Sequence, residues 1–148
     1  MNLSPQRARF LESDFSRGFI AFCGFSALSA GEGRFESELL VRPEHRQQDG
    51  FIHAGVMAAM SDHTAGYAAY TLVDETYRVL TIEFKINFLK PASGERLVCR
   101  AKVLRRGRSV MVAESAVFDL AEGRERDVTI AIVTLSPVPA SSLARARD

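Results

Sequence analysis

The sequence predicts an α+β fold in which one antiparallel sheet wraps around a single long, buried helix. The segment 53–71 is rich in Ala, Met and Gly, lacks proline and is apolar almost all round, which is typical of a buried helix. Four segments with the patterning of strands follow it between residues 79 and 135, and the short turns between them imply antiparallel neighbours. Since 148 residues suit one domain, we expect residues 1–148 to form a single α+β domain.

The residues before the long helix predict a short helix and a hairpin of two strands. Ser4 and Pro5 suit the cap and the first turn of a helix, which is expected over residues 5–14. The continuous apolar run 19–27 has the length and the aromatic content of a strand. A glycine-containing turn leads from it to a second expected strand over 34–41.

The segment 79–89 carries the strongest strand signal in the chain, because apolar and polar residues alternate along it. One face is expected to carry Leu80, Ile82, Phe84, Ile86 and Phe88, and the other Thr81, Glu83, Lys85 and Asn87. We expect Phe84, Ile86 and Phe88 to belong to the core. The alternative is that they line a tunnel for an acyl chain.

Turns and prolines delimit the rest of the chain. Before the long helix a polar loop is expected over 42–50, and after it further strands are expected over 96–104, 109–119 and 127–135. Pro137 and Pro139 are expected to end the last strand. The two ends are then an N-terminal helix within residues 1–16 and a frayed tail over 137–148.

Composition and charge exclude several classes of protein. Hydrophobic residues make up 47% of the chain, too many for a disordered protein. With 19 basic and 18 acidic residues the net charge is +1, so neither nucleic acid nor an anionic membrane is expected as a partner. No run approaches the roughly 20 apolar residues of a membrane span. The N-terminus lacks the pattern of a signal peptide, so a cytoplasmic location is expected.

Asp62 is the one acid in the long apolar helix. Burying a carboxylate costs several kcal/mol unless it is paired, hydrated or neutralised. A structural interpretation must therefore supply a partner, whereas a functional interpretation places the acid at a cleft or a subunit interface. Both interpretations are open from the residues alone.

The start of the same helix is a second candidate site. His53, Ala54 and Gly55 follow a loop, and free N–H groups with the positive end of the helix dipole favour a carbonyl oxygen or an oxyanion there. The alternative is an ordinary helix start with small residues for packing. Asp62 lies eight residues after Ala54, about 12 Å along a helix. If both act on one substrate atom, they must come from different subunits, which predicts a dimer with shared sites.

These residues resemble a known family. The triplet at 53–55, the acid nine positions after the histidine, and a strand that ends in Asn87-Phe88-Leu89-Lys90-Pro91-Ala92 are similar to the hotdog-fold acyl-CoA thioesterases of the PaaI-like group, over about residues 34–136. The resemblance implies a curved antiparallel sheet wrapped around the long helix. It implies hydrolysis of an acyl-CoA thioester by a homodimer with shared sites, or by a tetramer of two such dimers.

The resemblance also implies roles for particular residues. Asp62 falls at the catalytic carboxylate, which acts as general base or as nucleophile, and Ala54 falls where a backbone N–H polarises the thioester carbonyl, with Gly55 beside it. Gln47 falls where members carry Asn or Gln, and Thr81 where some place a hydroxyl near the water. Asp62 and Thr81 should come from the subunit opposite Gln47 and Ala54. The chain departs from the family in carrying Ala54 in place of the first glycine of His-Gly-Gly.

The remaining candidates concern substrate binding. His53 is expected to shape the helix start, the alternative being a direct catalytic role. Arg105, Arg106 and Arg108 in one turn, and Lys90 at the end of a strand, could hold the CoA phosphates, or could be solvated turn charges.

No cofactor beyond the CoA of the substrate is predicted. The sequence shows no cluster of metal ligands, no GxSxG and no GxGxxG. A non-catalytic acyl-CoA binding module is the alternative function. A hydratase or dehydratase of the same fold is a further one, but the Asp-x4-His pattern of those enzymes is absent.

Overall fold

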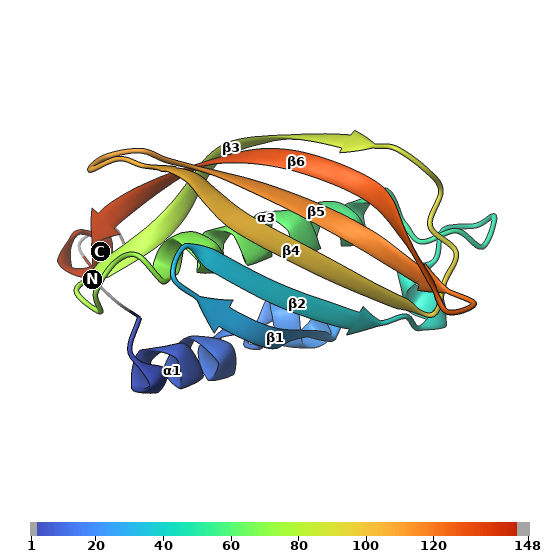
Figure 1. The fold of residues 1–148 in the computed structure, drawn as a ribbon, viewed down its shortest axis with the longest axis horizontal. Helices are drawn as coiled ribbons and strands as arrows, with labels where there is room; N and C mark the ends of the chain where they lie inside the picture. The colour runs from blue at the N-terminus through green and yellow to red at the C-terminus, as the bar shows by residue number, and fades with distance from the viewer. Residues whose placement is uncertain (1–2, 145–148) are drawn as a thin grey trace.

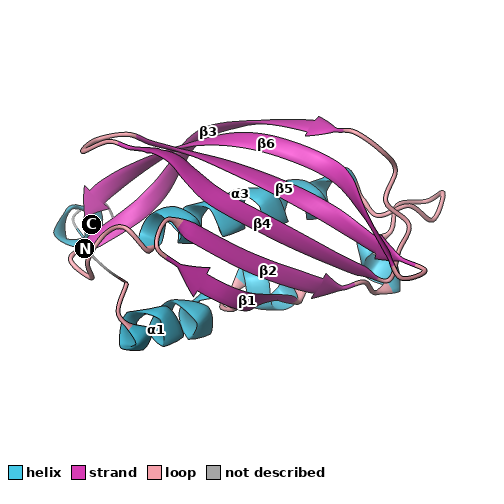
Figure 2. Cartoon of the chain, viewed as in Figure 1, coloured by secondary structure: helices cyan, strands magenta, loops and turns pink. Residues whose placement is uncertain are grey.

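The computed structural model describes residues 3–144 and shows the predicted α+β architecture (Figure 1). Six antiparallel strands form one sheet in the order β1-β2-β4-β5-β6-β3. The strands are β1 (Phe25–Gly31), β2 (Arg34–Leu40), β3 (Tyr77–Phe88), β4 (Arg96–Arg106), β5 (Met111–Ala121) and β6 (Arg124–Pro139). The α-helices are α1 (Pro5–Phe15), α2 (Phe19–Cys23), α3 (Ala54–Tyr70) and α4 (Ala140–Ala144), and a short 3-10 helix η1 (Pro43–His45) lies within the predicted loop 42–50. Figure 2 shows the sheet curving across α3, with α1 beside β1.

Helix α3 is the centre of the core, as the sequence predicted. Its buried residues include Met57, Met60, Ala65 and several further small side chains, which allow the strands to approach its backbone. The Thr64 hydroxyl is satisfied inside this core, because it donates to the Met60 carbonyl at 2.6 Å and accepts from the Ser37 hydroxyl at 2.7 Å. Within residues 3–144, no helix is long and apolar enough to span a membrane.

The strand predicted for residues 19–27 is wrong in its first half. Phe19–Cys23 forms the short helix α2, and β1 begins at Phe25. Gly18 and Gly24 flank this helix with φ of 55° and 81°, a backbone conformation that glycine adopts readily. Gly24 also closes the helix by donating its N–H to the Ile20 carbonyl at 3.0 Å. A short apolar run cannot by itself distinguish a strand from a helical turn.

Strand β3 contains a β-bulge that changes which side chains face α3. Its register with β6 shifts around Ile82. Before the bulge Thr81 pairs with Leu135, and after it Phe84 pairs with Val133. Both partners in β6 are fully buried, so Thr81 and Phe84 lie on the same, concave face of the sheet. The alternation predicted for this strand is therefore wrong at the bulge, since it placed Thr81 on the opposite face.

The expectation that Phe84, Ile86 and Phe88 are core residues is wrong for the single chain. Phe84 and Phe88 are 40% and 46% exposed, and Ile86 is half-buried against the edge of the core. The reason is their position, because β3 is the last strand in the sheet order. The three side chains form an apolar strip on the concave face at this edge, which we call the β3 strip.

The C-terminal prediction is wrong for residues 137–144. Strand β6 continues to Pro139, and Ala140–Ala144 forms α4, while residues 145–148 lie outside the described part. The prolines are tolerated because the pairing of β5 with β6 ends at Leu135. Beyond that point β6 pairs only with β3, so a missing N–H on the other side costs little. The other predicted elements are present, with ends that differ by a few residues.

Candidate active site

A tight loop precedes α3 and carries the first candidate residue. The chain pairs with itself at Arg46 and Ile52, and inside this pair Gln47 donates its N–H to the Phe51 carbonyl at 2.8 Å. The Gln47 side chain accepts the N–H of Asp49. The position of Gln47 is therefore set by hydrogen bonds at both its backbone and its side chain.

His53 caps the start of α3. Its Nδ1 accepts the Gly55 N–H at 2.9 Å, and a Cβ added at Gly55 would lie 3.0 Å from that nitrogen. This geometry supports the structural interpretation of His53 and explains why glycine follows. The Gly55 N–H is thus occupied by the cap. Within residues 3–144 no acceptor contacts the Ala54 N–H, which makes Ala54 the available donor at the helix start.

A pocket lies between the start of α3 and the end of β3, with a volume of about 510 Å³. It is lined by Gln47, Gln48, Phe51, Ile52, His53, Ala54, Met57, Phe88, Leu89, Lys90, Pro91 and Ala92. The structure therefore brings together four of the predicted site residues. Phe51 and Met57 also line the pocket but were not predicted as site residues, because their only sequence signal is that they flank the helix start.

Asp62 and Thr81 form a second cluster, at the middle of α3. The Thr81 hydroxyl donates to Oδ1 of Asp62 at 2.7 Å, a contact that depends on the bulge in β3. Within the described chain no Lys or Arg forms an ion pair with Asp62. One neutral hydroxyl thus holds a carboxylate whose second oxygen is open to accept a proton or to attack a carbonyl.

His63 points away from this cluster and belongs to the packing of α1. Its ring lies 4.6 Å from Phe15 and 4.9 Å from Tyr67, and Nε2 is 3.0 Å from the Phe15 carbonyl. Burial lowers the pKa of the His63 imidazole, so the neutral ring donates Nε2–H to that carbonyl. The Tyr67 hydroxyl donates to Asp14 at 2.8 Å on the same side of α3. Helix α1 is therefore anchored to α3 at His63 and Tyr67, on the side of α3 away from the Asp62–Thr81 pair.

The predicted phosphate-binding residues lie in two places. Lys90 borders the 510 Å³ pocket and pairs with Asp127 at 3.4 Å. The turn with Arg105, Arg106 and Arg108 lies past the other end of α3, and in the described part of the chain these guanidinium groups have no acidic partner. Arg106 is in register with Thr81 across the sheet, because Arg106 pairs with Met111, Met111 with Leu135, and Leu135 with Thr81. Three strand spacings separate them, about 14 Å.

The two clusters do not converge within one chain. Ala54 begins α3 and Asp62 lies eight residues further along the same helix, about 12 Å away. The oxyanion donor and the carboxylate are thus fixed at two points of one rigid element.

Comparison with known proteins places this geometry in a family. Residues 49–125 match the model of the thioesterase superfamily. An esterase-like protein of Saccharolobus solfataricus, itself assigned only provisionally, is 34% identical over 103 residues, covering 70% of this chain and 72% of that one. The chain belongs to the thioesterase superfamily and has its hotdog fold.

Two further matches describe the relationship. The crystal structure of a thioesterase family protein from Silicibacter pomeroyi superposes with a TM-score of 0.85 and 35% identity, covering 88% of this chain and 96% of that one. A 1,4-dihydroxy-2-naphthoyl-CoA hydrolase of Listeria monocytogenes is 24% identical over 99 residues, covering 67% of this chain and 80% of that one. The matches assign the chain to thioester hydrolysis in general.

Proposed function

We propose that this protein hydrolyses acyl-CoA thioesters at a site shared by two subunits. The observation that carries the proposal is that α3 holds an N–H donor at Ala54 and a carboxylate at Asp62 too far apart for one thioester carbonyl. Among the described residues, no acceptor binds that N–H and no Lys or Arg pairs with that carboxylate. The Listeria relative is named as a hydrolase of an aromatic acyl-CoA, which supports CoA as the thiol carrier.

The exposed edge of the sheet supports a dimer. Two copies related by a two-fold axis can pair their β3 strands antiparallel, which covers both β3 strips. Such pairing sets the end of one β3 beside the beginning of the other. The pocket at Ala54 and Gln47 then meets the partner subunit's Asp62 and the partner subunit's Thr81. A tetramer of two such dimers leaves this site unchanged.

The chemistry follows from the two clusters. Water attacks the thioester carbon while Asp62 accepts its proton, or Asp62 attacks the carbon itself and water later releases the acid. Negative charge on the carbonyl oxygen is stabilised by the Ala54 N–H and the positive end of α3. Thr81 holds one oxygen of the carboxylate and leaves the other for the reaction. The C–S bond breaks, and CoA leaves as a thiolate.

The basic residues would hold the phosphates of CoA. In the antiparallel dimer, Lys90 beside one pocket lies at the same end as the partner subunit's turn with Arg105, Arg106 and Arg108. A hollow of about 210 Å³ adjoins that turn, and its lining includes Leu72, Tyr77, Asp74, Arg106 and Arg108. These arginines have no acidic partner among residues 3–144 and suit the diphosphate, because guanidinium binds phosphate oxygens in a fork.

The direct test measures thiol release from short, medium and long aliphatic acyl-CoAs and from phenylacetyl-CoA and hydroxybenzoyl-CoA. Asp62→Asn keeps an acceptor for Thr81 and removes the base, so kcat should fall roughly 10²–10⁴-fold. Glu114→Gln, which breaks an ion pair with Lys102 at 3.2 Å, is the matched control and should leave kcat unchanged. Thioester binding without turnover by the wild type would instead support the binding module.

Ala54→Pro tests the oxyanion donor separately. Proline removes the N–H at the first helical position, where it is well tolerated, and His53 before it already has the extended conformation that proline requires, with φ −63° and ψ 137°. Activity should be lost while the fold remains. Mixing inactive Ala54→Pro and Asp62→Asn subunits should restore about a quarter of the wild-type activity, since half of the dimers are mixed and each has one complete site of two. No recovery after verified subunit exchange would refute the shared site.

A further inference from the structure

We infer that Arg46 is a positioning residue, which together with the buried Asp119 holds the loop before α3 against the loop after β3. The inference rests on the proposed function, because it concerns the placement of the Ala54 N–H and of Gln47. We call the hydrogen bonds of these two side chains to the backbone of Ser93 and Gly94, together with the Arg46 bond to Gly50, the loop clamp.

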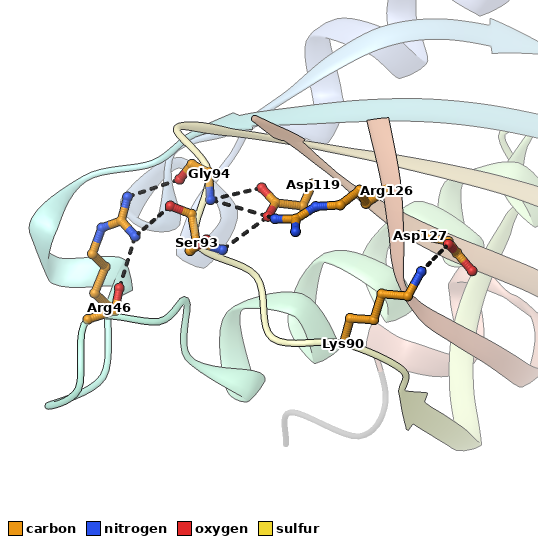
Figure 3. A network of polar contacts seen from close by, with 8 residues as sticks. Arg46, Lys90, Ser93, Gly94, Asp119, Arg126 and Asp127 are labelled. Carbon is orange, nitrogen blue, oxygen red and sulfur yellow. Dashed lines mark hydrogen bonds and ion pairs between the residues drawn. The ribbon is translucent and has the colours of Figure 1, made fainter. Parts of the chain in front are cut away.

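The Arg46 guanidinium joins the two loops directly. Nη1 donates to the carbonyls of Gly50 at 3.0 Å and Ser93 at 3.2 Å, and Nη2 donates to the carbonyl of Gly94 at 2.9 Å (Figure 3). One planar group thus bridges a carbonyl of its own loop and two carbonyls of the other. A lysine ammonium is a point donor on a flexible stem and cannot reproduce this fork.

Asp119 fixes the same loop from the sheet. It lies on β5 with 0% of its surface exposed, and its carboxylate accepts the N–H groups of Ser93 and Gly94, both at 3.0 Å. Arg126 supplies the compensating charge at 3.1 Å (Figure 3). A Cβ at Gly94 would lie 2.6 Å from the Leu120 carbonyl and would also collide with Asp119. The loop is therefore held on its carbonyl side by Arg46 and on its N–H side by Asp119.

The clamp acts on the candidate site through the backbone. Ile52 donates its N–H to the Ala92 carbonyl at 2.8 Å, and Ile52 is two residues before Ala54. Gln47 directly follows Arg46. Neither Arg46 nor Asp119 is among the described residues that line the 510 Å³ pocket. Both therefore act indirectly, through the loops that carry the lining residues. Displacing catalytic groups by about 1 Å can cost about 100-fold in rate, so this indirect support matters for kcat.

Arg46→Ala is the test, with Arg100→Ala as its matched control. Arg100 is also a partly exposed arginine with two hydrogen bonds, both to Glu125 at 2.5 and 2.9 Å. It lies on the face of the sheet that points away from α3. Arg46→Ala should lower kcat roughly 10–100-fold with a much smaller change in KM, the pattern of a defect in the transition state. Guanidinium ion at subdenaturing concentration should restore part of the kcat lost in Arg46→Ala. It should leave the kcat of Arg100→Ala unchanged. Arg46→Lys, a milder change for folding, should retain an intermediate kcat.

Hydrogen–deuterium exchange provides a readout independent of turnover. Amides of residues 50–56 and 92–94 should exchange faster in Arg46→Ala and return toward the wild-type rate with guanidinium. If the wild type hydrolyses no thioester, the proposed function fails, and these exchange rates still decide whether the clamp exists. Unchanged exchange, or a loss of kcat that only follows the loss of folded protein and is not rescued, would overturn the inference.

Discussion

Replacing Thr81 by valine removes one hydroxyl from the candidate site and keeps a β-branched side chain of nearly the same shape. The hydroxyl donates to Asp62 at 2.7 Å, and hydrogen bonds to charged groups contribute about 1.5–3 kcal/mol. Thr81 is exposed and Asp62 only half-buried, so the lower end of that range applies. About 1.4 kcal/mol corresponds to a factor of ten, and we expect kcat to fall about tenfold.

The assay is steady-state thiol release from the best acyl-CoA, with thermal unfolding to report the folded fraction. Thr134→Val is the matched control. Thr134 lies on the neighbouring strand β6, and its hydroxyl makes one long hydrogen bond, of 3.4 Å, to Glu83. Thr81→Ser keeps the donor and should keep most of the activity. Equal kcat for Thr81→Val and the wild type would refute the role of the hydroxyl. Equal activity would also contradict the position of Thr81 beside Asp62, since without the bulge Thr81 would lie on the same face of the sheet as Thr134.

Three further predictions concern stability and assembly. Gly94→Ala forces a Cβ to within 2.6 Å of the Leu120 carbonyl, so urea denaturation should show a loss of about 1–3 kcal/mol, and an unchanged midpoint would contradict the tight packing of this loop. Burial holds the pKa of His63 below its unfolded value near 6.5, so the unfolded chain binds more protons and the free energy of unfolding should fall as the pH drops through and below that value. His63→Gln should flatten this dependence, and an equally steep profile would exclude His63 as its source. Phe84→Lys charges the β3 strip, so in the proposed dimer it should leave inactive monomers, and light scattering measures the change in mass. An unchanged mass would contradict an interface at β3.

The sequence predicts the elements that have a long, regular pattern. The helix at 53–71 is present because a long apolar run without proline reflects burial on all sides, and the alternating strands are present because their period of two reflects burial of one face. It fails at Phe19–Cys23, where glycine backbone conformations decide between strand and helix. It fails again at Pro137 and Pro139, since whether a strand has a neighbour on its second side is a tertiary property.

The candidate site was predictable to a similar degree. Asp62 and the helix start are conspicuous because a lone acid and small residues interrupt an apolar pattern. The contact of Asp62 with Thr81 was hidden by the bulge, which carries no glycine to mark it. Asp119 did leave a signal, since it continues the inward-facing series that includes Ser115 and Val117 on β5. An acid at such a position implies a buried partner, although Asp119 was not among the predicted site residues.

In the proposed dimer, the exposed edge of β3 would link chemistry to the amount of protein present. If the donor and the carboxylate of each working site come from two chains, the rate per mole of chain is not constant. At protein concentrations below the dissociation constant of the β3 pairing, mass action would separate the subunits. The specific activity would then fall in proportion to the fraction of chains still associated. Saturating acyl-CoA, which bridges the halves, would then slow dissociation and raise the apparent stability of the pair. The substrate would thereby become part of what holds the two proposed subunits together.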